Sequence, residues 1–171
     1  MELEKWTAHV RRVPVMGGSG GTEMRYRSED FEVDGALRDV CILDASITDW
    51  RNLLEGLKSR DWTVCFAWTL SESNDGVIPD ADGLFGRLET EPEESARLAV
   101  QVGDIWFTCY FFDIDEIEFT FDPADVDGPL PFAHMEAFVR WLGDATRKDV
   151  VVTMEGTDHR AMPALIEYSP T

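Results

Sequence analysis

The clearest hydrophobic pattern lies in the middle of the chain, where two strand-like segments follow one another. Residues Ile105 to Phe112 are apolar on both faces, and Glu116 to Asp122 alternate strictly between polar and apolar side chains. Successive side chains of a strand point to opposite faces, so this alternation predicts a strand with one buried and one solvated face. The two segments predict an aromatic-rich hairpin with a central first strand and a turn at Asp113–Asp115.

Helical spacing of apolar residues predicts two main helices. Ile47 to Lys58 forms the first amphipathic stripe, and either Asp44 or Ser46 could cap its start. The second runs from Phe132 to about Arg147. Both stripes are typical of core packing.

Shorter apolar runs predict further strands. These are Trp6–Val15, Met24–Phe31, Leu37–Leu43, Trp62–Leu70, Ala96–Val102, Val150–Thr153 and Leu165–Tyr168. Trp62–Leu70 is apolar on both faces, which indicates a central strand. Ser71–Phe85 is polar and rich in turn residues, so we expect a long loop there, and Gly17–Gly21 indicates another loop.

Helices separated by runs of sequential strands favour an α+β fold, with a largely antiparallel sheet of about six strands packed by two main helices. The chain has 171 residues and shows neither an internal repeat nor a linker. A chain of this size can bury a sizeable core without disulfides or metals. We therefore expect residues 1–171 to form a single domain.

Charge changes this picture, because the chain is strongly acidic. Its formal net charge is −19, and Ser71 to Asp127 carries 16 acidic residues against two arginines. Nucleic-acid binding needs clustered Lys and Arg to replace counterions on phosphate, so this distribution argues against it. A basic protein partner, or a plain solubility surface, fits the charge better.

Three cysteines, Cys41, Cys65 and Cys109, each lie within an apolar run and form no CxxC pair. This pattern predicts buried free thiols rather than a disulfide framework or a zinc site. The start of the chain lacks the apolar stretch of a signal peptide, and no run is long enough for a membrane span. We expect a cytoplasmic protein that needs no cofactor.

The candidate binding residues are the carboxylates around the predicted hairpin, together with two in the predicted 71–85 loop. They are Asp113, Asp115, Glu116, Glu118, Asp122, Asp125, Asp127, Asp80 and Asp82. Oxygen-rich loops suit Ca²⁺ or Mg²⁺, and paired carboxylates can serve a hydrolase, but neither EF-hand spacing nor an acid–base pair is evident. We therefore keep a divalent-metal protein or hydrolase as the alternative to a partner-binding surface.

Other catalytic chemistry has little support in the sequence. His9, His134 and His159 are far apart and form no HExxH pair, so a helix-start position for His134 and a loop position for His159 are expected. No nucleophile signature surrounds a serine or cysteine. We expect a protein that is not an enzyme.

The C-terminal third carries an ordered series of patterns: an acidic E-I-E-F strand, a D-P turn, a helix with F-x-x-W-L, then K-x-V-V-V-T-x-E and a closing L-I-x-Y. In this order, from about Phe111 to Tyr168, the chain resembles small acidic bacterial immunity proteins of polymorphic or contact-dependent toxin systems. The resemblance implies a cytosolic, non-enzymatic inhibitor of a cognate toxin domain. A dense negative surface is compatible with that role, because it steers a basic partner and rejects others.

Overall fold

The computed structural model describes residues 24–71, 76–156 and 158–171. Its elements in chain order are η1 (Ser28–Phe31), β1 (Arg38–Leu43), α1 (Ile47–Lys58), β2 (Thr63–Trp68), α2 (Ala81–Thr90), β3 (Ala96–Val102), β4 (Ile105–Cys109), β5 (Glu116–Phe121), η2 (Pro123–Asp125), α3 (Pro129–Thr146), β6 (Val150–Met154) and β7 (Ile166–Tyr168). The strands form one sheet in the order β2-β3-β4-β5-β1-β6-β7, and the paired strands are antiparallel.

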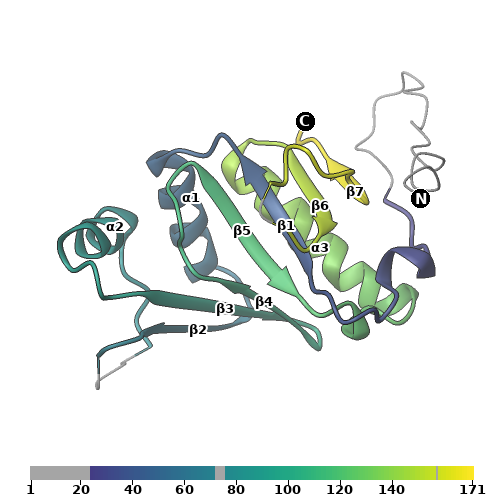
Figure 1. The fold of residues 1–171 in the computed structure, drawn as a ribbon, viewed down its shortest axis with the longest axis horizontal. Coiled ribbons are helices and arrows are strands. Elements are labelled where there is room, and N and C mark those ends of the chain that lie inside the picture. Colours follow the sequence, from purple (N-terminus) through teal and green to yellow (C-terminus); the bar gives the residue numbers. More distant parts are fainter. Residues whose placement is uncertain (1–23, 72–75, 157) are drawn as a thin grey trace, which may run out of the picture.

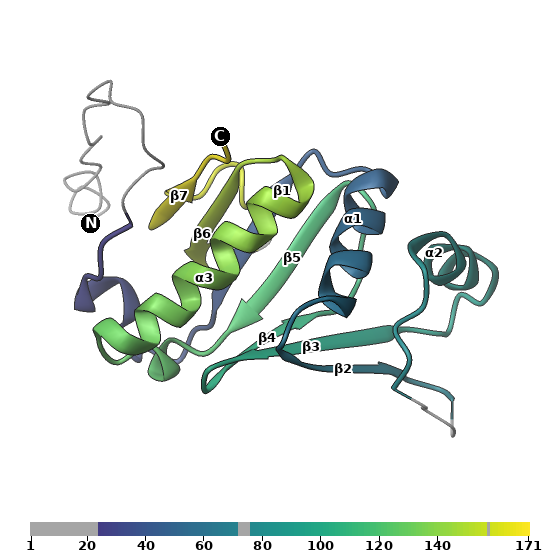
Figure 2. The ribbon, with the colours of Figure 1, turned by 180° about the vertical axis from the view of Figure 1, so that it is seen from behind.

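Helices α1 and α3 cover one face of the twisted sheet, and α2 lies at its end beside α1 (Figures 1 and 2). Among the described residues, no helix covers the opposite face of the sheet (Figure 1). The α+β prediction is therefore confirmed, with seven strands and three helices. In the described part of the chain, no helix has both the length and the apolar character needed to cross a membrane.

The core lies between the sheet and the two long helices. Strand β5 alternates as its sequence predicts, with Ile117, Phe119 and Phe121 buried. Phe138 of α3 stacks on Phe107 of β4 with ring centroids 4.0 Å apart. The polar side chains of the same strands consequently point to the opposite face, where the candidate site lies.

Several predicted elements are confirmed closely. Strand β1 and helix α1 match the apolar patterns, and the side chain of Ser46, rather than Asp44, caps the helix within a capping box with Asp49. Strands β3, β6 and β7 and helix α3 lie within two or three residues of their predicted bounds. The predicted Trp6–Val15 strand and Gly17–Gly21 loop lie outside the described residues.

Three predictions are wrong. Met24–Phe31 is not a strand; it ends in the 3-10 turn η1. The predicted 71–85 loop gives way to helix α2 at Ala81, because Ala81, Leu84 and Leu88 pack at helical spacing, a pattern obscured by two glycines. Strand β2 lies at the sheet edge rather than at its centre.

Gly103 makes the β3–β4 turn, where its backbone φ of +60° lies in the left-handed region. A Cβ at this position would also collide with the ring of His134 on α3. We expect Gly103→Ala to lower the free energy of unfolding by at least about 1 kcal/mol, because a non-glycine residue pays this cost in the left-handed region and the His134 ring must also move. Urea denaturation will measure it. Gly86→Ala is the control, since its Cβ would meet nothing within 4 Å, and an equal loss in both variants would contradict the explanation.

Candidate functional site

The helix-free face of the sheet brings polar side chains of β1 and β5 together. Val40 and Ile42 of β1 are buried under the helices, so Asp39 and Cys41, which alternate with them, face the other way. The strand register places Cys41 opposite Glu118 of β5. Asp39 and Cys41 are 1% and 0% exposed, so this part of the face is covered by other residues.

His159 provides part of that cover, because the connection between β6 and β7 brings it over β1 and β5. The side chain is buried among three carboxylates. Its Nε2 lies 2.8 Å from Asp39 Oδ2 and 3.6 Å from Glu118 Oε2, and its Nδ1 lies 3.2 Å from Glu116 Oε1. The backbone N–H of Gly156 also donates to Asp39 Oδ2. We call Asp39, Cys41, Glu116, Glu118 and His159 the His159 cluster.

The His159 cluster holds three carboxylates against one imidazole. Burial and the neighbouring charge of Asp39 raise the pKa of Glu118 to about 7. Burial also raises the pKa of Asp39, although its hydrogen bond to His159 opposes the shift. Burial alone would lower the pKa of His159, but the hydrogen bond to Asp39 and the surrounding carboxylates outweigh it and raise the pKa. Asp39, Glu118 and His159 therefore hold their protons to a higher pH than the same side chains would in water.

One oxygen of the His159 cluster lacks a partner. Among the described residues, Asp39 Oδ1 is the buried side-chain oxygen or nitrogen atom with no hydrogen bond. Burial also raises the pKa of the adjacent Cys41 thiol. The expectation of three buried cysteines holds for Cys41 and Cys109 but is wrong for Cys65, which is exposed because β2 is an edge strand.

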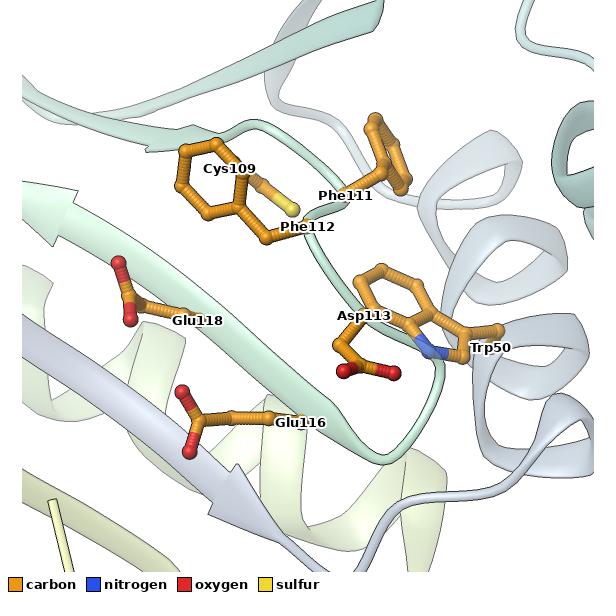
Figure 3. A pocket seen from close by; sticks show the side chains of 7 residues that line it. All are labelled: Trp50, Cys109, Phe111, Phe112, Asp113, Glu116 and Glu118. Carbon is orange, nitrogen blue, oxygen red and sulfur yellow. The ribbon is translucent and has the colours of Figure 1, made fainter. Parts of the chain in front are cut away.

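A small hollow opens where β4 and β5 separate. Their register pairs Thr108 with Thr120, and after Cys109 the chain leaves the strand and takes a left-handed conformation at Phe111, with φ of +57°. Trp50 of α1 holds the next turn by donating from Nε1 to the carbonyl of Ile114, at 2.9 Å. Figure 3 shows Glu116 and Glu118 side by side at the edge of this cavity of about 30 Å³, which matches one water molecule in size.

A larger groove lies between α2 and the turn that joins β4 to β5. It encloses about 610 Å³ and is lined by Ile47, Asp82, Phe85, Gly86, Leu88, Glu89, Phe111, Phe112, Asp113 and Ile114. We call it the α2 groove. Phe112 is 82% exposed and Ile114 is 40% exposed. The α2 groove thus combines apolar walls with three carboxylates and no basic lining residue.

The structure divides the nine predicted carboxylates into three groups. Asp113, Asp115, Glu116 and Glu118 lie at the start of β5, whereas Asp122, Asp125 and Asp127 lie beyond its other end. A six-residue strand spans roughly 20 Å, so these two groups are well separated. Burial and the charges of Asp122, Asp104 and Asp127 raise the pKa of Asp125.

The third group, Asp80 and Asp82, lies at the start of α2. Asp80 caps the helix by accepting from the N–H of Gly83, and Asp82 pairs with Arg51 at 2.7 Å. The α2 groove brings Asp82 and Asp113 to the same surface. Sequence reasoning named both residues as candidates, although it placed Asp82 on a loop and predicted no groove.

Sequence reasoning missed Asp39, Cys41 and His159. Asp39 offered a signal, because it is a charged residue within the apolar run of a predicted strand. His159 offered none, because its place over the sheet depends on the path of the β6–β7 connection. The predicted loop position of His159 is confirmed, but its side chain is 3% exposed and contacts side chains more than forty positions away in sequence, which the prediction did not include.

The structure groups metal-donor side chains differently from the cation site that the sequence suggested within residues 113–127. In the part of the chain that the structure describes, the grouping of metal-donor side chains is Cys41, Glu118 and His159, and it uses one residue of that segment. Comparisons of the chain with protein-family models, with curated proteins and with solved structures found no match.

Proposed function

We propose that this chain is a non-enzymatic, immunity-type protein of the bacterial cytoplasm that binds and neutralises a basic cognate toxin domain. The observation that supports this function best is the α2 groove, which is apolar inside and acidic at its rim. The resemblance of residues 111–168 to immunity proteins of polymorphic toxin systems supports the same class of partner. Contact-dependent inhibition is the setting that this class implies.

The apolar part of the groove provides the binding energy. Phe112 projects from the β4–β5 turn, and its ring stacks against Tyr110 with centroids 5.8 Å apart. An exposed aromatic beside a concave apolar surface is typical of the buried centre of a protein interface. A partner that inserts an apolar side chain between Phe112 and α2 would remove this surface from water.

The charges of the groove select the partner. Asp113 and Glu89 stand on opposite sides of it, and Asp115 and Glu116 follow along the chain towards the open face of the sheet. Asp80 extends the same negative surface around the start of α2, whereas the charge of Asp82 is balanced by Arg51. A basic toxin domain is attracted by this arrangement, and an acidic protein is repelled. The distant group of Asp122, Asp125 and Asp127 adds to the long-range field.

The buried position of the His159 cluster favours binding over hydrolysis. A catalytic carboxylate must reach its substrate, but Asp39 and His159 are 1% and 3% exposed. The cavity beside Glu116 and Glu118 has the size of one water molecule. Asp39 and His159 are therefore out of reach of a substrate, whereas the α2 groove is open to a protein partner.

The proposal predicts that a secreted protein with a basic C-terminal domain is encoded directly upstream of this gene, and the test uses that domain. We expect the purified chain to bind that domain and to rescue cells that express it. Phe112→Ala should weaken binding about tenfold, since interface aromatics carry a large share of binding energy. Leu130→Ala is the matched control, because Leu130 is 70% exposed but lies at the start of α3.

Salt provides a second readout in the same assay. Rising ionic strength should slow association of the wild-type pair, because exposed charges steer the encounter and are screened. The proposal fails if the upstream domain does not bind. It also fails if the two alanine variants bind equally well, or if association is independent of salt.

A further inference from the structure

We propose that Cys41, Glu118, His159 and Asp39 bind one Zn²⁺ ion, which fastens the β6–β7 connection to β1 and β5. This structural metal site is separate from the α2 groove and goes beyond the proposed toxin-binding function. The four side chains come from three segments that are distant in sequence. The ion would join them at the centre of the otherwise helix-free face of the sheet.

Three of the four donors already lie close together. One ligand atom each from Cys41, Glu118 and His159 lies within 4.8 Å of the other two. His159 Nε2 is 3.6 Å from Glu118 Oε2 and 2.8 Å from Asp39 Oδ2. Tetrahedral zinc with bonds of about 2.0–2.3 Å places neighbouring ligand atoms about 3.3–3.8 Å apart. Small side-chain adjustments therefore suffice for Cys41, Glu118 and His159, whereas Asp39 lies outside the 4.8 Å grouping and must turn from its hydrogen bond with His159 towards the ion.

The kinds of ligand select zinc over the hard cations. A thiolate and an imidazole suit Zn²⁺, whereas Ca²⁺ and Mg²⁺ prefer oxygen ligands alone. Four protein ligands would complete a tetrahedral shell and leave no open position for a substrate. Such a closed shell is typical of structural rather than catalytic zinc.

The surroundings of the ligands fit a bound ion in two ways. When Nε2 binds zinc, Nδ1 of His159 keeps its proton and donates to Glu116, which already lies 3.2 Å away. The ion also provides a partner for Asp39 Oδ1, the buried oxygen without a hydrogen bond. A divalent cation further balances the carboxylates that one imidazole leaves uncompensated.

The test treats the full chain with EDTA, removes the chelator and adds Zn²⁺ or Co²⁺ alone. Zn²⁺ should raise the melting temperature by mass action, and Mg²⁺ at the same concentration should not. One equivalent of Co²⁺ should produce a thiolate-to-metal charge-transfer absorption band. Cys41→Ser should remove this band and weaken zinc binding by at least about tenfold, whereas Cys65→Ser, on the exposed edge strand, should retain both.

Two further variants separate loss of a ligand from loss of the fold. Glu118→Gln replaces a partly exposed carboxylate with a similar shape, and it should fold but lose zinc binding. Glu116→Gln should keep the cobalt band and bind zinc about tenfold to a hundredfold more weakly, as expected for a residue that orients a ligand. The proposal is overturned if wild-type protein gives neither band nor thermal shift, or if Glu118→Gln binds zinc as wild type does. Failure here leaves the toxin-binding assay unaffected, because that assay reports on the α2 groove.

Discussion

Trp50→Ala is expected to lower the free energy of unfolding by about 3–5 kcal/mol, the range for removal of a large buried aromatic side chain. The Trp50 side chain is fully buried, and its ring lies 5.2 Å from the rings of both Phe85 and Phe111, measured between centroids. It therefore joins α1 to α2 and to the β4–β5 turn. Its loss removes packing under the α2 groove as well as the hydrogen bond to Ile114.

Urea denaturation followed by circular dichroism will measure this loss. Trp50→Phe should cost less, because it keeps an aromatic ring but leaves the carbonyl of Ile114 without its donor, a loss of roughly 1 kcal/mol in addition to a smaller cavity. Trp106→Ala is the control, since Trp106 is 39% exposed on the uncovered face of β4. If Trp50→Ala and Trp106→Ala destabilise the fold equally, Trp50 does not hold the groove in the way that its contacts indicate.

Glu118→Gln is expected to stabilise the metal-free protein by about 2 kcal/mol at pH 8, because it removes a carboxylate that burial and Asp39 disfavour. A pKa raised to about 7 would by itself correspond to a destabilisation of more than about 2 kcal/mol. The side chain is partly exposed, so solvent screening reduces this value. Below the unfolded-state pKa the carboxyl is neutral in both states. As pH rises towards 7, the unfolded state ionises first, so the wild type loses stability relative to the variant.

Melting temperatures of both proteins at pH 5 and pH 8 in EDTA will test whether the wild type loses stability relative to the variant as pH rises. The raised pKa of His159 acts in the same direction, because its contribution is present at low pH and is lost as the imidazole deprotonates. Glu167→Gln, an exposed carboxylate on β7, should change stability little at either pH. A wild type that is more stable than Glu118→Gln at pH 8 without metal would contradict the origin of the pKa shift.

Zinc should reverse the order of stability of the wild type and Glu118→Gln. Without metal, Glu118→Gln gains stability from the loss of an unfavourable buried charge. With Zn²⁺, the wild type should become the more stable protein, because its carboxylate is now a ligand. The same side chain thus distinguishes the two states of the His159 cluster.

The candidate site combines predictable and unpredictable parts. The alternation of β5 places Glu116 and Glu118 on the face opposite Phe119, and this follows from a period of two alone. The nine predicted carboxylates, however, do not form one surface. Asp122, Asp125 and Asp127 follow the same strand, and the length of β5 carries them away from Asp113, a separation that the predicted strand already implied.

Local patterns determined the elements of this protein. Periods of two and of 3.6 residues, the Ser46 cap and the Gly103 turn predict β1, β5, α1, α3 and the antiparallel hairpins, because these features depend on neighbours in sequence. Tertiary structure alone decided that β2 is an edge strand, that α2 packs beside the β4–β5 turn, and that His159 covers Asp39 and Cys41. Each of these depends on contacts between segments far apart in the chain, whose energies are set by the packed fold and not by any local spacing.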